Sequence, residues 1–245
     1  MRNKNSIVLL TREFNIQRNI TDSPFSGLSW EDTEMLSIAI LNDMLMGFSE
    51  IPETDVILFI KNSEFKKNYI QYPFENFIVI DTQAVNDNQM LNYAINYVSD
   101  NGYRRNIITM NYYPICDTTF YKNVLLFLAD EQEYLFIAPL KDLTLGMVAL
   151  RDIHKNIFNN ITEVQANEIE KFVEYFISND LYLITPGIIP SIMDVSDIID
   201  LKFAIEKLIR LKLKYPQNTY NLLRQFEKKH IIKKNNETRN IRRYF

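Results

Sequence analysis

The chain has 245 residues, of which 47% are hydrophobic and 24% charged, a composition typical of a folded domain and not of a disordered chain. No apolar run approaches the roughly 18 residues of a membrane span, and a single cysteine excludes an internal disulfide or a multi-cysteine zinc site. Residues 228–245 hold seven basic residues and one acidic residue, so this end carries +6, the rest −10 and the whole −4. An acidic body excludes general nucleic-acid binding.

Apolar runs rich in β-branched residues alternate with stretches of helical periodicity. In chain order the expected elements are a strand at 7–11, a loop at 21–28, a helix from Ser29 to Gly47, strands at 55–60 and 77–80, a helix at 87–100, a strand at 106–110, a helix at 117–129, strands at 134–138 and 143–150, a helix at 162–178, a strand at 181–184, an extended piece at 188–195, a helix at 197–213 and a last helix opened by Pro216. Ser29 followed by Asp32 is a helix-capping pattern.

This alternation predicts an α/β protein with three layers, in which a mostly parallel central sheet is covered by helices on both faces. Since no linker-like stretch interrupts the pattern, we expect one domain over 1–215 and a helical C-terminal extension with a basic tail over 216–245. Residues from about 230 onward hold little apolar area, so we expect them to be dispensable for folding. The first apolar run, 7–10, is too short for a signal peptide, which predicts a cytoplasmic protein.

Standard catalytic motifs are absent from the sequence. Five glycines are too few for a glycine-rich phosphate loop, and the two histidines share no metal-ligand spacing. Three carboxylates stand at predicted strand ends or loops, namely Asp117, Asp142 and Asp194. Such carboxylates can hold Mg²⁺ against the phosphates of a nucleotide. Helix capping is the alternative role for Asp117 and Asp194, and a turn is the alternative for Asp142.

Several stretches resemble one known superfamily when they are read together. They are Met193-Asp194-Val195-Ser196-Asp197-Ile198-Ile199-Asp200-Leu201 before a helix, Ile137-Ala138-Pro139-Leu140-Lys141-Asp142 before a strand, Thr109-Met110-Asn111-Tyr112-Tyr113-Pro114, Ser23-Pro24-Phe25, and Asn218-Thr219-Tyr220-Asn221-Leu222-Leu223. Over roughly residues 6–225 the chain resembles the nucleotide-diphospho-sugar transferases of the GT-A fold. The subgroup it resembles most is the 2-phospho-L-lactate guanylyltransferases of deazaflavin coenzyme synthesis, and related bacterial glycosyltransferase-like proteins are nearly as similar.

The resemblance implies a nucleotide site and a metal site, each with named residues. Thr11, Arg12, Arg18 and Asp142 match positions that would bind the nucleotide, and Asp194 with Asn111 would hold Mg²⁺ or Mn²⁺. The chain departs from the pattern at the metal. Asn111 stands where relatives have an aspartate, Ser196 replaces the second acidic residue, and Leu143-Thr144 replaces a pair of glycines. An uncharged amide is a weaker ligand of a hard cation than a carboxylate.

These observations support two functional hypotheses. The first is a divergent nucleotidyltransferase-like or glycosyltransferase-like protein that binds a nucleoside triphosphate or a nucleotide sugar, without the usual metal-dependent catalysis. The second is a non-catalytic pseudoenzyme that serves as a nucleotide-binding or protein-interaction module. No membrane partner is expected. Aromatic pairs such as Tyr112-Tyr113 are compatible with a homo-oligomer interface or with the core.

Overall fold

The computed structural model describes residues 5–10, 27–60, 75–83, 87–109, 113–114, 118–129, 134–141, 145–151, 174, 182–185, 187–192, 194–229 and 231–232. Strands from these residues form one seven-stranded sheet in the order β3-β2-β1-β4-β6-β5-β7. The strands are β1 Asn5–Leu10, β2 Thr54–Ile60, β3 Phe77–Asp81, β4 Arg105–Thr109, β5 Tyr134–Pro139, β6 Leu145–Arg151 and β7 Tyr182–Ile184. Each matches a strand expected from the apolar runs, with ends that shift by one or two residues.

Strand direction follows the connections between the strands. β1 pairs in parallel with β2 and β4, and β2 pairs in parallel with β3. β6 is antiparallel to both of its neighbours, β4 and β5, because it returns from β5 through the short connection 140–144. The carboxyl ends of the parallel strands therefore meet at one edge of the sheet, and the amino end of β6 joins them there.

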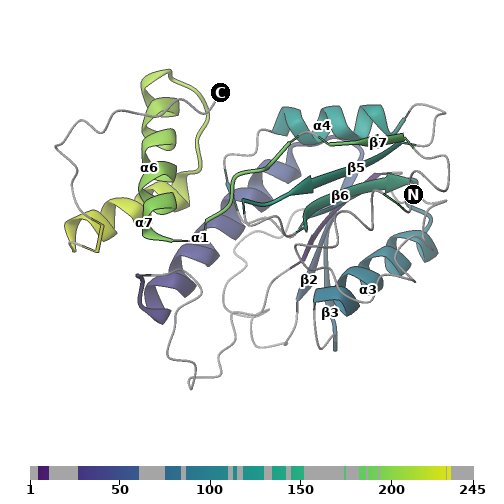
Figure 1. Cartoon of the computed structure of the whole chain (residues 1–245), viewed down its shortest axis with the longest axis horizontal. Helices are drawn as coiled ribbons and strands as arrows, with labels where there is room; N and C mark the ends of the chain where they lie inside the picture. The colour runs from purple at the N-terminus through teal and green to yellow at the C-terminus, as the bar shows by residue number, and fades with distance from the viewer. Residues whose placement is uncertain are drawn as a thin grey trace.

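Two apolar clusters show that helices cover both faces of the sheet. Alternate β1 residues face opposite ways: Ile7 and Leu9 belong to one cluster, and Val8 and Leu10 to the other. α1 (Trp30–Ser49) and α4 (Thr118–Phe127) pack on the first face, and α3 (Asp87–Asp100) packs on the second (Figure 1). The result is the predicted three-layer αβα arrangement with a mostly parallel sheet.

Polar pairs close the amino edge of the sheet. The Ser6 hydroxyl donates to the Asn106 side-chain oxygen at 2.7 Å, and both residues are buried. The Tyr103 hydroxyl donates to the Asp55 carboxylate at 2.7 Å, also out of contact with water. These pairs give the amino edge a structural role, although the buried Asn5 Oδ1 at the start of β1 has no hydrogen-bond partner. Ligands of open α/β sheets bind at the carboxyl edge, which is therefore the place to look for a site.

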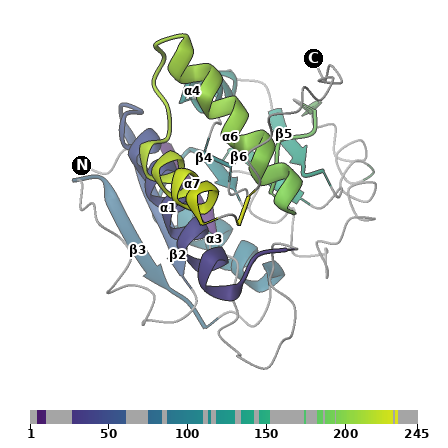
Figure 2. The same ribbon diagram turned by 90° about the vertical axis from the view of Figure 1, so that its left-hand side faces the viewer.

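The last two helices lie together, and the second of them packs on α1. α6 spans Val195–Arg210 and α7 spans Gln217–Lys228, and Figure 2 shows α7 in front of α1, with α6 beside α7. The N-terminus of α7 lacks a cap from its own N-cap residue, Pro216. Asp43 of α1 supplies one instead: it accepts the backbone N–H of Asn218 at 3.1 Å and that of Thr219 at 2.7 Å. The division of the chain at 215 stays a prediction, but α7 is tied directly to α1.

The expectations for the C-terminal part are met in some places and fall outside the described residues in others. Ile232 is only 2% exposed and belongs to the core with Phe226, so apolar area is buried beyond residue 230, and dispensability itself stays a prediction. The expected extended piece passes the end of β5, where the Ile189 N–H donates to the Pro139 carbonyl at 2.9 Å, and its last residue, Val195, already belongs to α6. Most of the predicted helix at 162–178 and loop at 21–28 lies outside the description. Among the helices described, none has the length and apolar character needed to cross a membrane.

Candidate functional site

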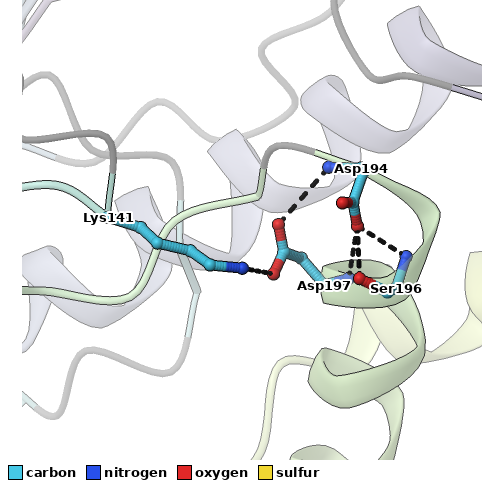
Figure 3. Close-up of polar contacts among 4 residues, drawn as sticks. All are labelled: Lys141, Asp194, Ser196 and Asp197. Atoms are coloured by element: carbon cyan, nitrogen blue, oxygen red, sulfur yellow. Dashed lines mark hydrogen bonds and ion pairs between the residues drawn. The ribbon is translucent and has the colours of Figure 1, made fainter.

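The first turn of α6 is built around Asp194. This residue is the N-cap: its Oδ1 accepts the N–H of Ser196 at 2.7 Å, the N–H of Asp197 at 3.0 Å and the Ser196 hydroxyl at 2.6 Å (Figure 3). The capping box is completed by the Asp194 N–H, which donates to Asp197 Oδ2 at 3.3 Å. Hydrogen bonding, above all from the Ser196 hydroxyl, lowers the pKa of Asp194, so this carboxylate is ionised at neutral pH.

An ion pair connects this turn to the end of β5. The ammonium of Lys141, two residues after β5, lies 2.8 Å from Asp197 Oδ1. The Asp197 side chain is 10% exposed, whereas that of Lys141 is 61% exposed. The hydrogen bond to Asp197 raises the pKa of Lys141, with further contributions from the charges of Asp194 and Asp200. Lys141 is therefore a firmly charged cation at the carboxyl edge of the sheet.

The chain that follows β1 returns to the same turn. Gly27 has φ +91°, which L-residues rarely adopt, and a Cβ at this position would lie 2.8 Å from Cγ2 of Val195. The backbone at Gly27 therefore packs closely against the start of α6. Three segments meet here: residues 27–29 before α1, residues 139–141 at the end of β5, and residues 194–197 at the start of α6.

A buried hydroxyl lies just before this turn in the chain. Ser191 is 8% exposed, and its Oγ has no hydrogen-bond partner. It lies in 187–192, the segment held against the end of β5 by Ile189. A buried hydroxyl without a partner destabilises the fold by roughly 1–3 kcal/mol.

The structure describes two of the residues that the sequence selected for the site, Asp194 and Ser196. They lie together in one hydrogen-bonded turn, in which Asp194 has the capping role that sequence reasoning named as its alternative. The other six lie outside the described residues: Thr11, Arg12, Arg18, Asn111, Asp117 and Asp142. Their neighbours are described: β1 pairs with β4 as Leu9 opposite Thr109, and Lys141 directly precedes Asp142. The strand ends that lead to them are thus at the same edge as Asp194, and their roles stay predictions.

The described residues of this turn do not fit a Mg²⁺ or Mn²⁺ ion. Such ions take several oxygen ligands, mostly carboxylates and waters. Of the four carboxylate oxygens of Asp194 and Asp197, three already accept hydrogen bonds, and for Asp197 Oδ1 the donor is the ammonium of Lys141. Within the described ranges, moreover, no group of three or more histidine, cysteine, aspartate or glutamate side chains is placed to hold a metal.

Sequence reasoning missed Lys141 and Asp197 as site residues. Lys141 was noted only as the neighbour of Asp142, and Asp197 only as part of the helix that follows Asp194. The two are 56 residues apart in the chain, and neither belongs to a pattern that signals an ion pair. The sequence did contain one relevant cue, a charged residue two positions after a buried strand, at the edge where α/β sheets bind ligands.

No model of a known protein family matches the chain, and no curated protein matches it. Solved structures do. A protein from Desulfovibrio desulfuricans G20, provisionally named a nucleotide-diphospho-sugar transferase, is similar with a TM-score of 0.75 and 17% identity over 92% of this chain and 96% of its own. A cytidylyltransferase from Leptospira borgpetersenii gives a TM-score of 0.51 and 16% identity over 97% and 99%.

A third similar structure is that of CMP:2-keto-3-deoxy-manno-octonic acid synthetase in complex with CTP, with a TM-score of 0.51 and 7% identity over 83% of this chain and 99% of its own. Identities this low establish the fold and no more. The chain has the fold of nucleotide-diphospho-sugar transferases and cytidylyltransferases, which confirms the expected architecture.

Proposed function

We propose that this chain binds a nucleoside triphosphate or a nucleotide sugar at the carboxyl edge of its sheet, as a divergent nucleotidyltransferase-like or glycosyltransferase-like protein. The observation that carries the proposal is the meeting of residues 27–29, 139–141 and 194–197 at this edge. Ligands of open α/β sheets bind in the crevice outside the carboxyl ends of the strands. One protein of the same fold was solved with CTP, which makes a nucleotide the first ligand to test.

In this proposal different residues at the edge contact different parts of the nucleotide. Arg12 and Arg18 contact phosphates, since guanidinium groups match phosphate geometry, and Thr11 and Asp142 line the nucleotide. The resemblance of residues 193–201 and 218–223 to 2-phospho-L-lactate guanylyltransferases makes GTP the first base to try. The location of the protein in the cytoplasm and its assembly into a homo-oligomer stay predictions. Sedimentation of the full chain tests its oligomeric state.

One observation favours the alternative function, a non-catalytic nucleotide-binding or interaction module. Phosphoryl and nucleotidyl transfer depend on neutralising charge that develops on phosphate. At two positions where relatives have aspartates that would bind a metal for this purpose, this chain has Asn111 and Ser196. Asp194 itself uses one oxygen to cap α6. A protein that binds a nucleotide without turning it over is consistent with this loss.

Calorimetric titration of the full chain with GTP, CTP, UTP and a UDP-sugar tests the proposal. We expect saturable binding of at least one nucleotide, and the absence of binding across the panel would refute the proposal. Release of pyrophosphate from GTP in the presence of 2-phospho-L-lactate then separates the enzyme from the non-catalytic module.

The variant Asn111→Asp tests the metal position within this proposal. A restored carboxylate provides one hard anionic ligand, so we expect Mn²⁺ to tighten nucleotide binding more in the variant than in the parent. Asn76→Asp is the matched control, because it adds the same charge at an exposed residue directly before β3 begins, at the opposite edge of the sheet. Equal responses of the two variants would show that position 111 is not a metal site.

A further inference from the structure

We infer that the ammonium of Lys141 takes the place of a divalent cation at the carboxyl edge of the sheet, so that this chain binds the phosphates of its nucleotide without metal. The inference rests on the proposed function, which it deepens by naming the group that meets the phosphates. It depends on three features of the described residues: the occupied carboxylate oxygens, the exposed ammonium, and the low cost of moving that ammonium.

The first feature is that the carboxylates at this turn already have partners. Asp194 Oδ1 accepts three hydrogen bonds from α6 and its side chains, and Asp197 Oδ2 accepts the N–H of Asp194. A metal bound through Asp194 Oδ1 or Asp197 Oδ2 would compete with these bonds and weaken the cap of α6, which is worth about 1 kcal/mol. Of the four oxygens, only Asp194 Oδ2 accepts neither one of these bonds nor the ammonium of Lys141. The same bonds do not hinder a phosphate, which needs donors and positive charge instead of anionic ligands.

The second feature is the balance of charge. One ammonium and the N-terminal dipole of α6, worth about half a positive charge, face the carboxylates of Asp194 and Asp197. The negative charge of Asp200, further along α6, also stabilises the charged form of Lys141. The negative charge that would attract a divalent cation is therefore partly cancelled. The cation that cancels it is also the most exposed side chain of the ion pair, and an arriving phosphate would meet it first.

The third feature is that Lys141 can change partner at little cost. An ion pair with one member well exposed to water contributes only about 0–1 kcal/mol. Asp197 would keep its hydrogen bond from the Asp194 N–H when the ammonium leaves. A lysine has four rotatable side-chain bonds, so its ammonium can turn from Asp197 to a phosphate at the same edge.

The competing explanation is that the ion pair is purely structural and ties β5 to α6. Both explanations predict a small loss of stability when Lys141 is neutralised. Only the binding role predicts a loss of nucleotide affinity, because only then does the ammonium touch the ligand. A direct measurement of affinity, made without metal and with it, therefore distinguishes them.

The test uses calorimetry on the full chain with the nucleotide that binds tightest, in EDTA and in Mg²⁺, for the parent and three variants. Lys141→Met removes the charge with similar length, and Lys141→Arg keeps it. Lys214→Met is the matched control: Lys214 is 63% exposed and pairs with Glu50, at the other end of α6. Thermal melts confirm that each variant is folded.

We expect equal parent affinities in EDTA and in Mg²⁺. A hydrogen bond between the ammonium of Lys141 and a phosphate would contribute roughly 1.5–3 kcal/mol to binding. Its loss in Lys141→Met should therefore weaken binding at least about tenfold. Lys141→Arg should retain most of the affinity, and Lys214→Met should behave as the parent. Binding that requires Mg²⁺, or equal affinities of Lys141→Met and Lys214→Met, would overturn the inference while leaving the proposed function intact. A parent that binds no nucleotide in either buffer would refute the proposed function, and the inference with it.

Discussion

Replacing Asp43 should reveal how α7 is held to the body of the protein. Its carboxylate accepts three hydrogen bonds from the N-terminus of α7: the backbone N–H groups of Asn218 and Thr219 at 3.1 and 2.7 Å, and the Asn218 side-chain amide at 3.0 Å. Pro216 provides no side-chain cap. In Asp43→Ala, two backbone donors at a helix N-terminus therefore lose their partner.

The size of the effect follows from these contacts. Hydrogen bonds to a charged group contribute roughly 1.5–3 kcal/mol each, and burial of the carboxylate offsets part of that gain. We expect Asp43→Ala to lower the free energy of unfolding by about 2–4 kcal/mol. For a chain of this length that corresponds to a drop of roughly 5–15 °C in Tm. Asp43→Asn keeps one acceptor oxygen and should lose about half as much.

Urea unfolding followed by circular dichroism measures these differences. The matched control is Glu34→Ala, since Glu34 lies on the same helix, whereas the hydrogen bonds to the N-terminus of α7 come from Asp43. A loss below about 0.5 kcal/mol for Asp43→Ala would refute the reasoning, because a surface substitution without lost contacts has an effect of that size.

The same residue predicts a dependence of stability on pH. Burial raises the pKa of Asp43 above its usual 3.8, and the hydrogen bonds from Thr219 and Asn218 oppose this only in part. The folded protein thus binds this proton more tightly than the unfolded chain does. The stabilisation is complete below about pH 3.8 and is lost as the pH rises through the folded value. The stability of the parent relative to Asp43→Asn should therefore fall over that interval, and a rise would contradict the assignment.

Three further predictions concern stability. Lys212 has φ +57° in the turn after α6, so Lys212→Gly should raise the urea midpoint by an amount equivalent to about 1 kcal/mol, and a lower midpoint would count against a strained turn. Ser191→Ala removes a buried hydroxyl without a partner, and calorimetry should show a Tm that is unchanged or higher; a clear loss would reveal a partner for it. Removing 231–245 should cost about 1.5–3 kcal/mol more than removing 233–245, because only the first deletion takes away buried Ile232; equal melts would show that Ile232 does not anchor the chain.

Local features of the fold were predictable because their causes are local. Strands such as β1 and β2 are buried throughout, and after two polar residues each continues as an unbroken apolar run, 7–10 and 56–60, in the sequence. The caps at Ser29 and Asp194 were also predictable, since a side chain that bonds N–H groups two or three residues on leaves a short pattern. These features needed no knowledge of the rest of the chain.

Features that join distant residues were not predictable in the same way. The direction of β6 follows from its short connection to β5 and not from its apolar pattern, because side chains alternate in parallel and antiparallel strands alike. Its pairing with the distant β4 is what the sequence does not give. Asp43 was one polar residue in an amphipathic helix, and its partner Asn218 is 175 residues away. Lys141 and Asp197 likewise meet only after β5 and α6 have taken their places. The part of the candidate site that depends on such contacts had to come from the structure.

The attachment of α7 to α1 also sets an order of events during synthesis. α1 buries Leu41, Leu45 and Phe48 in the same core as Leu223 and Phe226 of α7. A ribosome adds roughly 5–20 residues each second, so the nearly 170 residues between these helices take about ten seconds or more to make. Throughout that interval the nascent chain carries an apolar surface on α1 with its last partner missing. Chaperone demand during translation should therefore be concentrated on this surface, and it should end when residues 223–226 leave the exit tunnel.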